Sequence, residues 1–537
     1  MKPPERPSPF CRAESERLVS RKPLFSKVLV ANRGEIAIRI FRTCHEIGID
    51  TVAVYSDADA LAPHRAEARQ AFRIGPAPAG ESYLAVDRIL EAAAQSGAEA
   101  IHPGYGFLAE NADFAEAVQT AGLVWIGPPP EAMRLLGDKT AARKMAADQA
   151  VPVVPGTPGP VRGIDEARPA AAGIGYPVLL KAAAGGGGKG MRVVEAEEDL
   201  EKALKMAGSE ARSAFGDDAV YIEKYLERPR HVEVQIMADA HGTCVWLGER
   251  ECSVQRRHQK IIEESPSPVL TPQIRREMGE AAVRLASAAG YRGAGTVEYL
   301  LEGDSFYFLE VNARLQVEHP VTEMVTGRDL VHDQLLIAAG QSLGYDQEDI
   351  QPTGHAIEVR LYAEDPDNNF YPAPGIITAV DPASGPGIRH DSGVGTGSEV
   401  TLHYDPLIAK LIAWAPDRSR AIRRLRRALT EYQIAGVTTI LPFLREILLY
   451  EPFESGRYDT TIVPRMMEER RRQIAEKALS GPAAEEDHYA FVAAVATALF
   501  HVGRSGGFLG DDGGSGPAPP AASAWKEQGR RLELWRR

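Results

Sequence analysis

Cysteine is scarce in this chain: only four of the 537 residues are cysteines, at positions 11, 44, 244 and 252. They form no CxxC pair and no zinc-ligand spacing, which argues against a disulfide framework and favours a reducing compartment. Positive charge is also in deficit, because 61 basic residues face 74 acidic ones and leave a formal net charge of −13. This balance argues against general nucleic-acid binding.

Long apolar runs are missing as well. The most apolar long window, Tyr489–Val502, is too short to span a bilayer and is typical of a packed helix. The first 22 residues contain four prolines and three glutamates but no apolar core, so they do not resemble a signal peptide. We therefore expect a cytoplasmic protein that spans no membrane.

The composition is otherwise that of a large folded protein, with 44% hydrophobic and 25% charged residues. The length predicts roughly three to four domains. We expect a disordered leader over 1–22, an N-terminal open α/β domain over 23–150, a mobile lid over 151–226, a strand-rich catalytic and C-terminal region over 227–465, and a helical tail with a flexible linker over 466–537.

Strand patterns alternate with helical stretches in the first 150 residues. Short apolar runs predict strands at 27–31, 51–55, 99–102 and 123–126. Such alternation indicates an open α/β sheet. The predicted fold class is therefore α/β at the N-terminus and α+β beyond it.

A glycine-rich loop, residues 184–191, carries four consecutive glycines between two predicted strands. Without Cβ atoms, its backbone N–H groups can wrap closely around an anion. Lys181 ends the preceding strand, and Lys139 follows a predicted helix cap at Asp138, so both lysines are candidates for phosphate contacts. A flexible hairpin tip and a solvated surface lysine are the alternative interpretations.

Two carboxylates form the most specific candidate site in the sequence. Residues 296–301 and 306–312 read as neighbouring strands of a hairpin, and a three-residue loop would bring Glu298 opposite Glu310. Glu310 and Asn312 are two apart and share one face of their strand. Two carboxylates and an amide oxygen suit Mg²⁺ or Mn²⁺ that bridges nucleotide phosphates, whereas a solvent-facing sheet surface would oppose two glutamates without a cation.

The polar alternation continues through Arg314, Gln316 and Glu318. If this segment is extended, the three side chains point together and could hold a small oxyanion and remove its proton. An Arg–Glu pair is otherwise typical of a surface ion pair. The basic run 255–260 precedes these strands, and we interpret it as lining a phosphate channel rather than as a solvated face.

Together these motifs resemble the biotin carboxylase subunit of biotin-dependent carboxylases, a family with the ATP-grasp fold. The resemblance covers roughly residues 24 to 465. It rests on four segments: Ala31-Asn-Arg-Gly-Glu-Ile-Ala, Ile101-His-Pro-Gly-Tyr-Gly-Phe-Leu, Gln255-Arg-Arg-His-Gln-Lys and Gln316-Val-Glu-His-Pro-Val-Thr-Glu.

The resemblance implies roles for individual residues. ATP-phosphate contacts fall on Lys139, Lys181, Gly187 and Gly188. Further nucleotide contacts fall on Glu223, Lys224, Tyr225, Leu226, His231, Gln255 and His258, and the metal ligands are Glu298, Glu310 and Asn312. Lys260, Arg314, Gln316 and Val317 would hold bicarbonate, Glu318 would be the base that deprotonates it, and Arg360 would stabilise the biotin enolate.

One absence follows from the same comparison. A biotinylation site of the Glu-Ala-Met-Lys-Met type does not occur in the chain. The resemblance therefore implies that biotin arrives on a separate carrier protein, that a carboxyltransferase subunit completes the complex, and that the chain forms a homodimer. The final acceptor stays open between acetyl-CoA, propionyl-CoA, another acyl-CoA and pyruvate.

Two other functions compete with this interpretation. A different ATP-grasp ligase, which joins a carboxylate to an amine, would share the loop and the metal strands but would not need Arg360 or the 255–260 cluster. A non-catalytic scaffold would lack some of the expected ligands, yet all are present. Behind a Gly/Pro-rich linker, the segment Trp525–Arg537 is a candidate docking segment for a partner protein, or an unstructured tail.

Overall fold

The computed structural model describes residues 24–161, 163–182, 191–215 and 219–479. The predicted leader, the glycine-rich loop with Gly187 and Gly188, the helix at 489–502 and the candidate docking segment lie outside these residues. The chain divides into two units, 1–467 and 468–537, and the second is described only where helix α16 (Ile462–Leu479) enters it. All sites below belong to the first unit.

The N-terminal sheet is parallel, with strand order β3-β2-β1-β4-β5. All four predicted strands are confirmed as β1 (Lys27–Val30), β2 (Asp50–Ser56), β4 (Ala100–His102) and β5 (Val124–Trp125). The prediction missed β3 (Gln70–Gly75), an edge strand that buries only its last two residues and therefore lacks a hydrophobic run. Its helices are α2 (Gly34–Glu46), α3 (Pro63–Glu67), α4 (Val86–Ser96) and α5 (Ala112–Thr120), with short 3₁₀ turns at Asp57–Asp59 and Ala79–Glu81.

Two short helices lead out of this domain. Helix α6 (Pro130–Gly137) ends where Asp138 caps α7 (Lys139–Asp148), because the Asp138 carboxylate accepts hydrogen bonds from the N–H groups of Thr140 and Ala141. The predicted capping arrangement is confirmed, and it places Lys139 in the first turn of α7.

The segment 151–226 builds a small antiparallel sheet with order β7-β6-β8. The strands are β6 (Val178–Ala182), β7 (Met191–Val194) and β8 (Val220–Lys224), and helices α8 (Ile164–Ile174) and α9 (Glu197–Phe215) pack on them around a core that includes Leu180 and Ile222. At its base the Phe308 N–H donates to the Pro152 carbonyl over 2.7 Å, which ties this unit to the large sheet.

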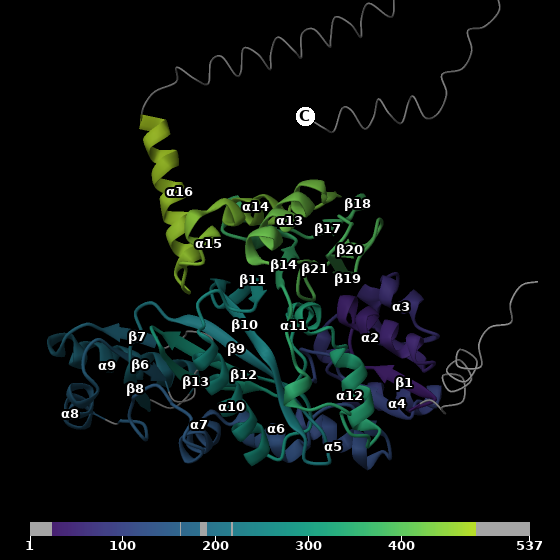
Figure 1. Cartoon of the computed structure of the whole chain (residues 1–537), viewed down its shortest axis with the longest axis horizontal. Coiled ribbons are helices and arrows are strands. Elements are labelled where there is room, and N and C mark those ends of the chain that lie inside the picture. The colour runs from purple at the N-terminus through teal and green to yellow at the C-terminus, as the bar shows by residue number, and fades with distance from the viewer. Residues whose placement is uncertain (1–23, 162, 183–190, 216–218, 480–537) are drawn as a thin grey trace, which may run out of the picture. The chain divides into compact units, whose positions relative to one another are not determined.

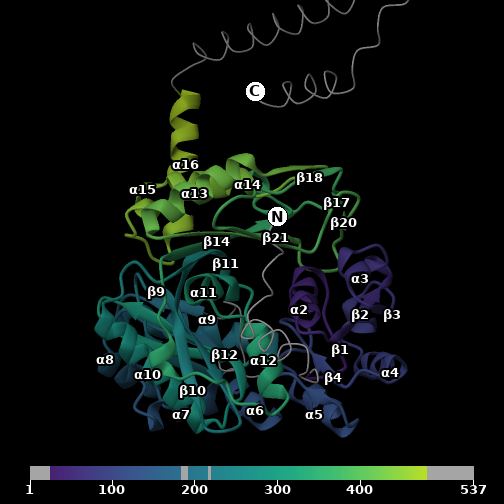
Figure 2. The same ribbon diagram turned by 45° about the vertical axis from the view of Figure 1, so that its right-hand side comes forward.

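The large sheet has eight antiparallel strands in the order β13-β12-β9-β10-β11-β14-β21-β19. Their bounds are β9 (Arg230–Ala238), β10 (Cys244–Arg256), β11 (Gln259–Ser265), β12 (Gly293–Glu302), β13 (Ser305–Asn312), β14 (His355–Tyr362), β19 (Ile388–Ser392) and β21 (Leu407–Ala415). Helices α10 (Pro272–Ala288), α11 (His319–Thr326), α12 (Leu330–Ala338) and α13 (Arg418–Glu431) cover it (Figures 1 and 2).

Every residue of β14 is buried, because the strand is covered on both faces. Ile357, Val359 and Leu361 join the apolar core under α13. The alternate residues face α11, where Ala356 packs against Val321 and Val325. This period of two explains how one strand contributes both to a hydrophobic core and to the polar site described below.

Short ribbons and helices complete the first unit. The paired strands are β15 (Glu364–Asp365) with β16 (Tyr371–Pro372), β17 (Gly375–Ile376) with β20 (Glu399–Val400), and β18 (Ala379–Asp381) with β22 (Gln433–Ala435). The remaining helices are α14 (Leu441–Leu449) and α15 (Glu451–Glu454), with 3₁₀ turns at Gln347–Asp349 and Pro366–Asn368. Helix α16 begins at Ile462, earlier than the Met466 that the charge pattern predicted. Among the described helices, none combines the length and apolarity that a membrane span requires.

Candidate active site

The register of β12 and β13 places two carboxylates together. Glu298 lies directly opposite Glu310, as predicted, and Thr296 lies opposite Asn312. The predicted three-residue loop is wrong: Glu302 pairs with Ser305, so the turn has two residues, and a β-bulge farther along restores the pairing. The bulge adds one residue to β13 and thereby turns both glutamates to the same face.

The two glutamates differ in their surroundings. Glu298 is buried, and its Oε1 accepts hydrogen bonds from Lys260 (2.9 Å), Asn312 (2.8 Å) and Gln316 (2.9 Å). Burial raises the pKa of Glu298, but Lys260 and His231 outweigh it and hold that pKa well below its ordinary value. Burial and the neighbouring Glu298 raise the pKa of Glu310.

A divalent cation fits this arrangement. Among the described residues, the one ion pair of Glu310 is with the Lys139 ammonium, 4.0 Å away, and Glu310 lies opposite Glu298 across the hairpin. Two opposed carboxylates and the Asn312 amide oxygen are the oxygen donors that Mg²⁺ prefers. The structure thus brings together the three residues that the sequence assigned to a metal.

The segment after β13 is not extended, so the predicted alternation of Arg314, Gln316 and Glu318 is wrong as a strand. Residues 313–316 are irregular, and Glu318 immediately precedes α11 in a helix-like conformation. The chain turns because His319 and Pro320 begin the helix, where proline at N1 or N2 is favourable. Arg314 consequently points to Glu110 (2.9 Å), while Glu318 points into the buried cluster around Lys260.

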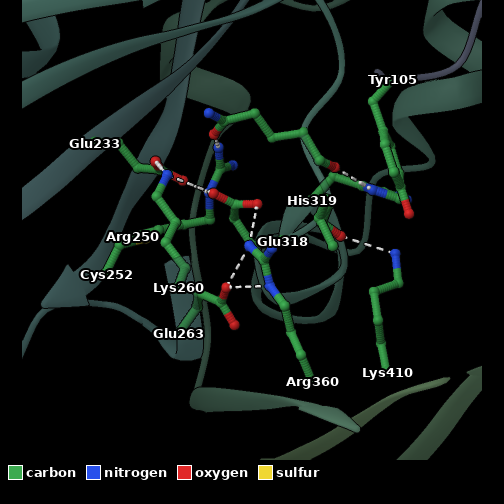
Figure 3. Close-up of polar contacts among 12 residues, drawn as sticks. Tyr105, Glu233, Arg250, Cys252, Lys260, Glu263, Glu318, His319, Arg360 and Lys410 are labelled. Carbon is green, nitrogen blue, oxygen red and sulfur yellow. Dashed lines mark hydrogen bonds and ion pairs between the residues drawn. The ribbon is translucent and has the colours of Figure 1, made fainter. Parts of the chain in front are cut away.

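Lys260 is the centre of that cluster. Its ammonium lies 2.5 Å from Glu233 and 2.6 Å from Glu318 (Figure 3). It also lies 2.9 Å from Glu298. Burial lowers the pKa of Lys260, but the three carboxylates outweigh it and hold that pKa well above its ordinary value. One ammonium therefore links the predicted metal ligand to the predicted base, and burial makes this link strong.

Arg360 approaches Glu318 from the other side. Its Nη2 lies 2.9 Å from Glu318 Oε2, while Nε and Nη2 lie 2.7 and 2.5 Å from Glu263 Oε1 (Figure 3). Burial raises the pKa of Glu318, but Lys260 and Arg360 outweigh it and hold the pKa well below the ordinary range. Glu318 is therefore ionised at neutral pH. Burial raises the pKa of Glu263 to about 7 even though Arg360 opposes that rise.

Sequence reasoning missed Arg250, Glu233 and Glu263. Arg250 is fully buried and donates to Glu233 (2.5 Å), Gln235, Thr296, Thr322 and Gln316 (2.9 Å). Alternation in β9, where the acidic and amide positions are two apart, was the available signal. Cys252 is buried beside this cluster, and burial raises the pKa of its thiol well above the ordinary value, as expected for an unreactive cysteine.

The predicted phosphate lysines lie along a second edge of the site. Lys181 pairs with Glu223, which also accepts from Arg143 of α7 over 2.6 Å. Lys139 begins the same helix and lies beside Glu310. A cleft of about 260 Å³ opens here and is lined by Glu110, Lys139, Glu310 and Asn312 among others. Helix α7 thus contacts Glu310 through Lys139 and, through Arg143, the same Glu223 that pairs with Lys181.

Of the residues predicted to contact the nucleotide, some lie beside the buried cluster and others lie away from it. The Gln255 amide donates to His231 Nδ1 over 2.9 Å, which leaves the proton on Nε2, 2.9 Å from Glu298. Lys224 donates instead to the carbonyls of Gly175 and Tyr176, next to Tyr225 and the buried Leu226. His258 occupies the two-residue turn between β10 and β11 with an exposed side chain, so the structure keeps it outside the buried cluster. Val317 contributes its carbonyl, which accepts from Lys410 over 2.8 Å.

Family models match three consecutive parts of the chain. The biotin carboxylase N-terminal domain matches residues 24–133, the ATP-binding domain of the carbamoyl-phosphate synthase L chain matches 138–345, and the biotin carboxylase C-terminal domain matches 358–465. The chain belongs to the biotin carboxylase family. This membership confirms the predicted ATP-grasp fold and the ATP-dependent ligase activity.

Relatives of several carboxylase types are similar to this chain. Biotin carboxylase of Haemophilus influenzae is 51% identical over 434 residues, which cover 81% of this chain and 97% of the relative. A pyruvate carboxylase subunit of Methanothermobacter thermautotrophicus is 52% identical over 440 residues (82% and 90%). The match to the alpha subunit of Mus musculus methylcrotonoyl-CoA carboxylase, 51% identical, covers 82% of this chain but only 62% of that relative.

Solved structures agree with this assignment. The biotin carboxylase βγ-ATP complex from Campylobacter jejuni superposes with a TM-score of 0.78 and 46% identity, covering 82% of this chain and 99% of that one. The biotin carboxylase domain dimer of 2-oxoglutarate carboxylase from Hydrogenobacter thermophilus, in complex with MgADP, ADP and bicarbonate, gives 0.76 and 46%, with 82% and 97% covered. ATP, Mg²⁺ and bicarbonate are thus ligands of this family.

Proposed function

We propose that this chain carboxylates biotin on a separate carrier protein, with bicarbonate as carbon source and ATP as energy source. The observation that carries the proposal is the position of Glu318, between the Lys260 ammonium and the Arg360 guanidinium and one ion pair away from the Glu298–Glu310 hairpin. A base, cations for an anionic substrate and metal ligands for a nucleotide are therefore contiguous.

Glu318 would act on bicarbonate. Lys260 and Arg360 keep it ionised and ready to accept a proton, although the same cations weaken it as a base. A bicarbonate anion held by Lys260, Arg314 and the Gln316–Val317 backbone would add negative charge beside it. That charge raises the proton affinity of Glu318 while the substrate is bound, so deprotonated bicarbonate can attack the γ-phosphate of ATP and form carboxyphosphate.

The remaining charges would serve the phosphates. Mg²⁺ at Glu298, Glu310 and Asn312 neutralises the transferring phosphoryl group when bound. Lys139 and Lys181 would hold phosphate oxygens, and His231 with Gln255 would orient Glu298 from behind. Residues 151–226 would act as a lid whose closure excludes water from the reactive anhydride.

Arg360 would serve the second half of the reaction. Its guanidinium is anchored by Glu263 and points at Glu318, so a biotin ureido group entering beside it would meet a preorganised donor. Carboxyphosphate would break down to CO₂ and phosphate, and this phosphate would take the proton from the ureido nitrogen. Negative charge that develops on the ureido oxygen would be stabilised by Arg360 while the nitrogen attacks the CO₂. This division assigns ATP turnover to Glu318 and carboxyl transfer to Arg360.

The proposal extends to the final carboxyl acceptor and to the oligomeric state. The similar proteins include subunits of pyruvate and methylcrotonoyl-CoA carboxylases, so family membership does not select one acceptor. We assign that choice to a carboxyltransferase subunit. The Hydrogenobacter domain is a dimer, and we propose a homodimer for this chain as well.

The decisive experiment supplies the purified chain with MgATP, labelled bicarbonate and a biotinylated carrier domain. We expect label on the carrier, with ADP release that requires bicarbonate and increases with biotin. ADP release that depends on an amine and ignores biotin would instead identify a carboxylate–amine ligase, and nucleotide binding without turnover would identify a scaffold.

A further inference from the structure

Lys410 is a buried lysine that the reaction described above does not use. It lies on β21 directly opposite Arg360 of β14, and its side chain is 0% exposed. Burying an ammonium is costly unless each of its protons finds a partner. The groups that contact the buried ammonium therefore indicate its structural role.

Three groups from distant parts of the chain surround the Lys410 ammonium. The carbonyl of Val317 accepts its hydrogen bond over 2.8 Å, and Glu35 Oε1 lies 3.1 Å away. The ring of Tyr105 lies 5.9 Å from it, and the Tyr105 hydroxyl donates to the same Glu35 oxygen. Lys410 thus connects Glu35, in the first turn of α2, and Tyr105 to Val317, the residue before the base Glu318.

The Val317 carbonyl belongs to the peptide unit that joins Val317 to Glu318. Because a peptide unit is planar, fixing its carbonyl also fixes the direction of the next N–H group and the position of the Glu318 Cα. Lys260 and Arg360 hold the Glu318 carboxylate, and Lys410 lies on the other side of Glu318 from Lys260 (Figure 3). There Lys410 holds the preceding carbonyl, that of Val317. The turn is therefore clamped between cations on two sides.

Another acceptor could draw Lys410 away from Val317. Glu358 lies on the same face of β14 as Arg360, and among the described residues neither of its buried carboxyl oxygens has a hydrogen-bond partner. Burial raises the pKa of Glu358 well above its ordinary value although Lys410 opposes the rise. Among the described residues, the Lys410 ammonium is directed at Val317 and Glu35 and makes no hydrogen bond to Glu358.

We propose that Lys410 is a positioning residue for the base Glu318, and that Glu35 and Tyr105 orient Lys410 for this task. The inference rests on the proposed function of Glu318 and extends it to groups that touch no substrate. A misplacement of about 1 Å at a reacting group costs roughly 10²-fold in rate. Lys410→Met should therefore lower kcat/KM for bicarbonate about 100-fold, while nucleotide affinity stays near wild type.

The experiment measures bicarbonate-dependent ADP release and MgADP affinity in the full chain. The variants are Lys410→Met, the isosteric Glu35→Gln, and the matched control Glu358→Gln, which replaces a buried acid on the same face of β14 as Arg360. We expect a large loss in kcat/KM for bicarbonate in Lys410→Met, a smaller loss of about tenfold in Glu35→Gln, and a change within about twofold in the control, all with MgADP affinity within about twofold of wild type.

Three results would overturn the inference: bicarbonate kinetics of Lys410→Met within about threefold of wild type, a parallel loss of MgADP affinity in Glu35→Gln, or an equal loss in Glu358→Gln. If Lys410→Met does not fold, Glu35→Gln decides the question, because it keeps the shape of the site and removes only the charge. Glu318→Gln separates this failure from failure of the proposed function: an inactive Glu318→Gln beside an active Lys410→Met removes Lys410 alone, whereas an active Glu318→Gln removes the base itself.

Discussion

Arg360 offers a test that separates stability from chemistry. Its guanidinium joins two buried carboxylates, with contacts of 2.5 Å to Glu263 and 2.9 Å to Glu318. Arg360→Gln leaves both without that cation, and breaking a buried pair in this way typically costs about 3–5 kcal/mol. Glu318 keeps Lys260, so Glu263 bears most of the loss. Without Arg360 the pKa of Glu263 should rise further above its ordinary value, so a stranded carboxylate persists only at alkaline pH; there, adding Glu263→Gln should recover a large part of this stability.

Carboxylation activity should not recover in the double variant, in contrast to stability. Loss of one donor to a developing oxyanion costs about 10²–10³-fold in kcat, so carboxylation of biotin should fall by this factor in Arg360→Gln and stay low in the double variant. Bicarbonate-dependent ADP release should remain within about tenfold of wild type in the double variant. Urea unfolding and the two turnover assays measure these quantities side by side. Recovery of carboxylation in the double variant, or equal loss of both activities, would refute the assigned role.

Three further predictions concern single carboxylates. Glu298→Gln should raise the Mg²⁺ concentration needed for half-maximal nucleotide binding by at least about tenfold, and an unchanged Mg²⁺ titration would remove this residue from the metal site. Because burial raises the pKa of Glu263 to about 7, the folded chain keeps a proton that the unfolded chain releases; wild type should lose stability relative to Glu263→Gln as the pH rises from about 4.5 to 7, and parallel urea-unfolding curves would contradict this. Burial raises the pKa of Glu264, but His355 and Arg418 outweigh it and lower this pKa to about 2. Glu264→Gln should therefore lower the free energy of unfolding by about 3 kcal/mol at neutral pH. The stability difference between variant and wild type should disappear as the pH falls from about 4.5 to 2.

The regular elements were predictable because their patterns are local. Apolar runs located β1, β2, β4 and β5, and a short polar cap located the start of α7 at Lys139. Strand β3 escaped because an edge strand needs no continuous apolar face. The predicted pairing of Glu298 with Glu310 is confirmed, although the predicted turn is wrong. A two-residue turn followed by a bulge gives the same register at these residues as a three-residue loop. Residue types alone do not distinguish these two solutions.

The site was predictable only where its residues carry a motif. Glu318 and Arg360 were found, but the extended segment expected for Arg314–Glu318 is wrong, because the helix start at His319 turns the chain and sends Arg314 toward Glu110. Lys410 was missed because it is the single charged residue of an otherwise apolar strand. Glu233 was missed although Gln235 lies two residues farther along the same strand, because so short a polar alternation does not by itself indicate a site. The roles of both residues depend on cross-strand register and on burial, which arise from long-range pairing.

The central claim is that bicarbonate, activated at Glu318, attacks the γ-phosphate of ATP. The most direct test follows oxygen from ¹⁸O-labelled bicarbonate into the released phosphate. Attack by bicarbonate predicts one labelled oxygen in each phosphate formed, and this labelled turnover should fall at least about 100-fold in Glu318→Gln. Phosphate that carries no label, or labelled turnover that is unchanged in Glu318→Gln, would contradict the account.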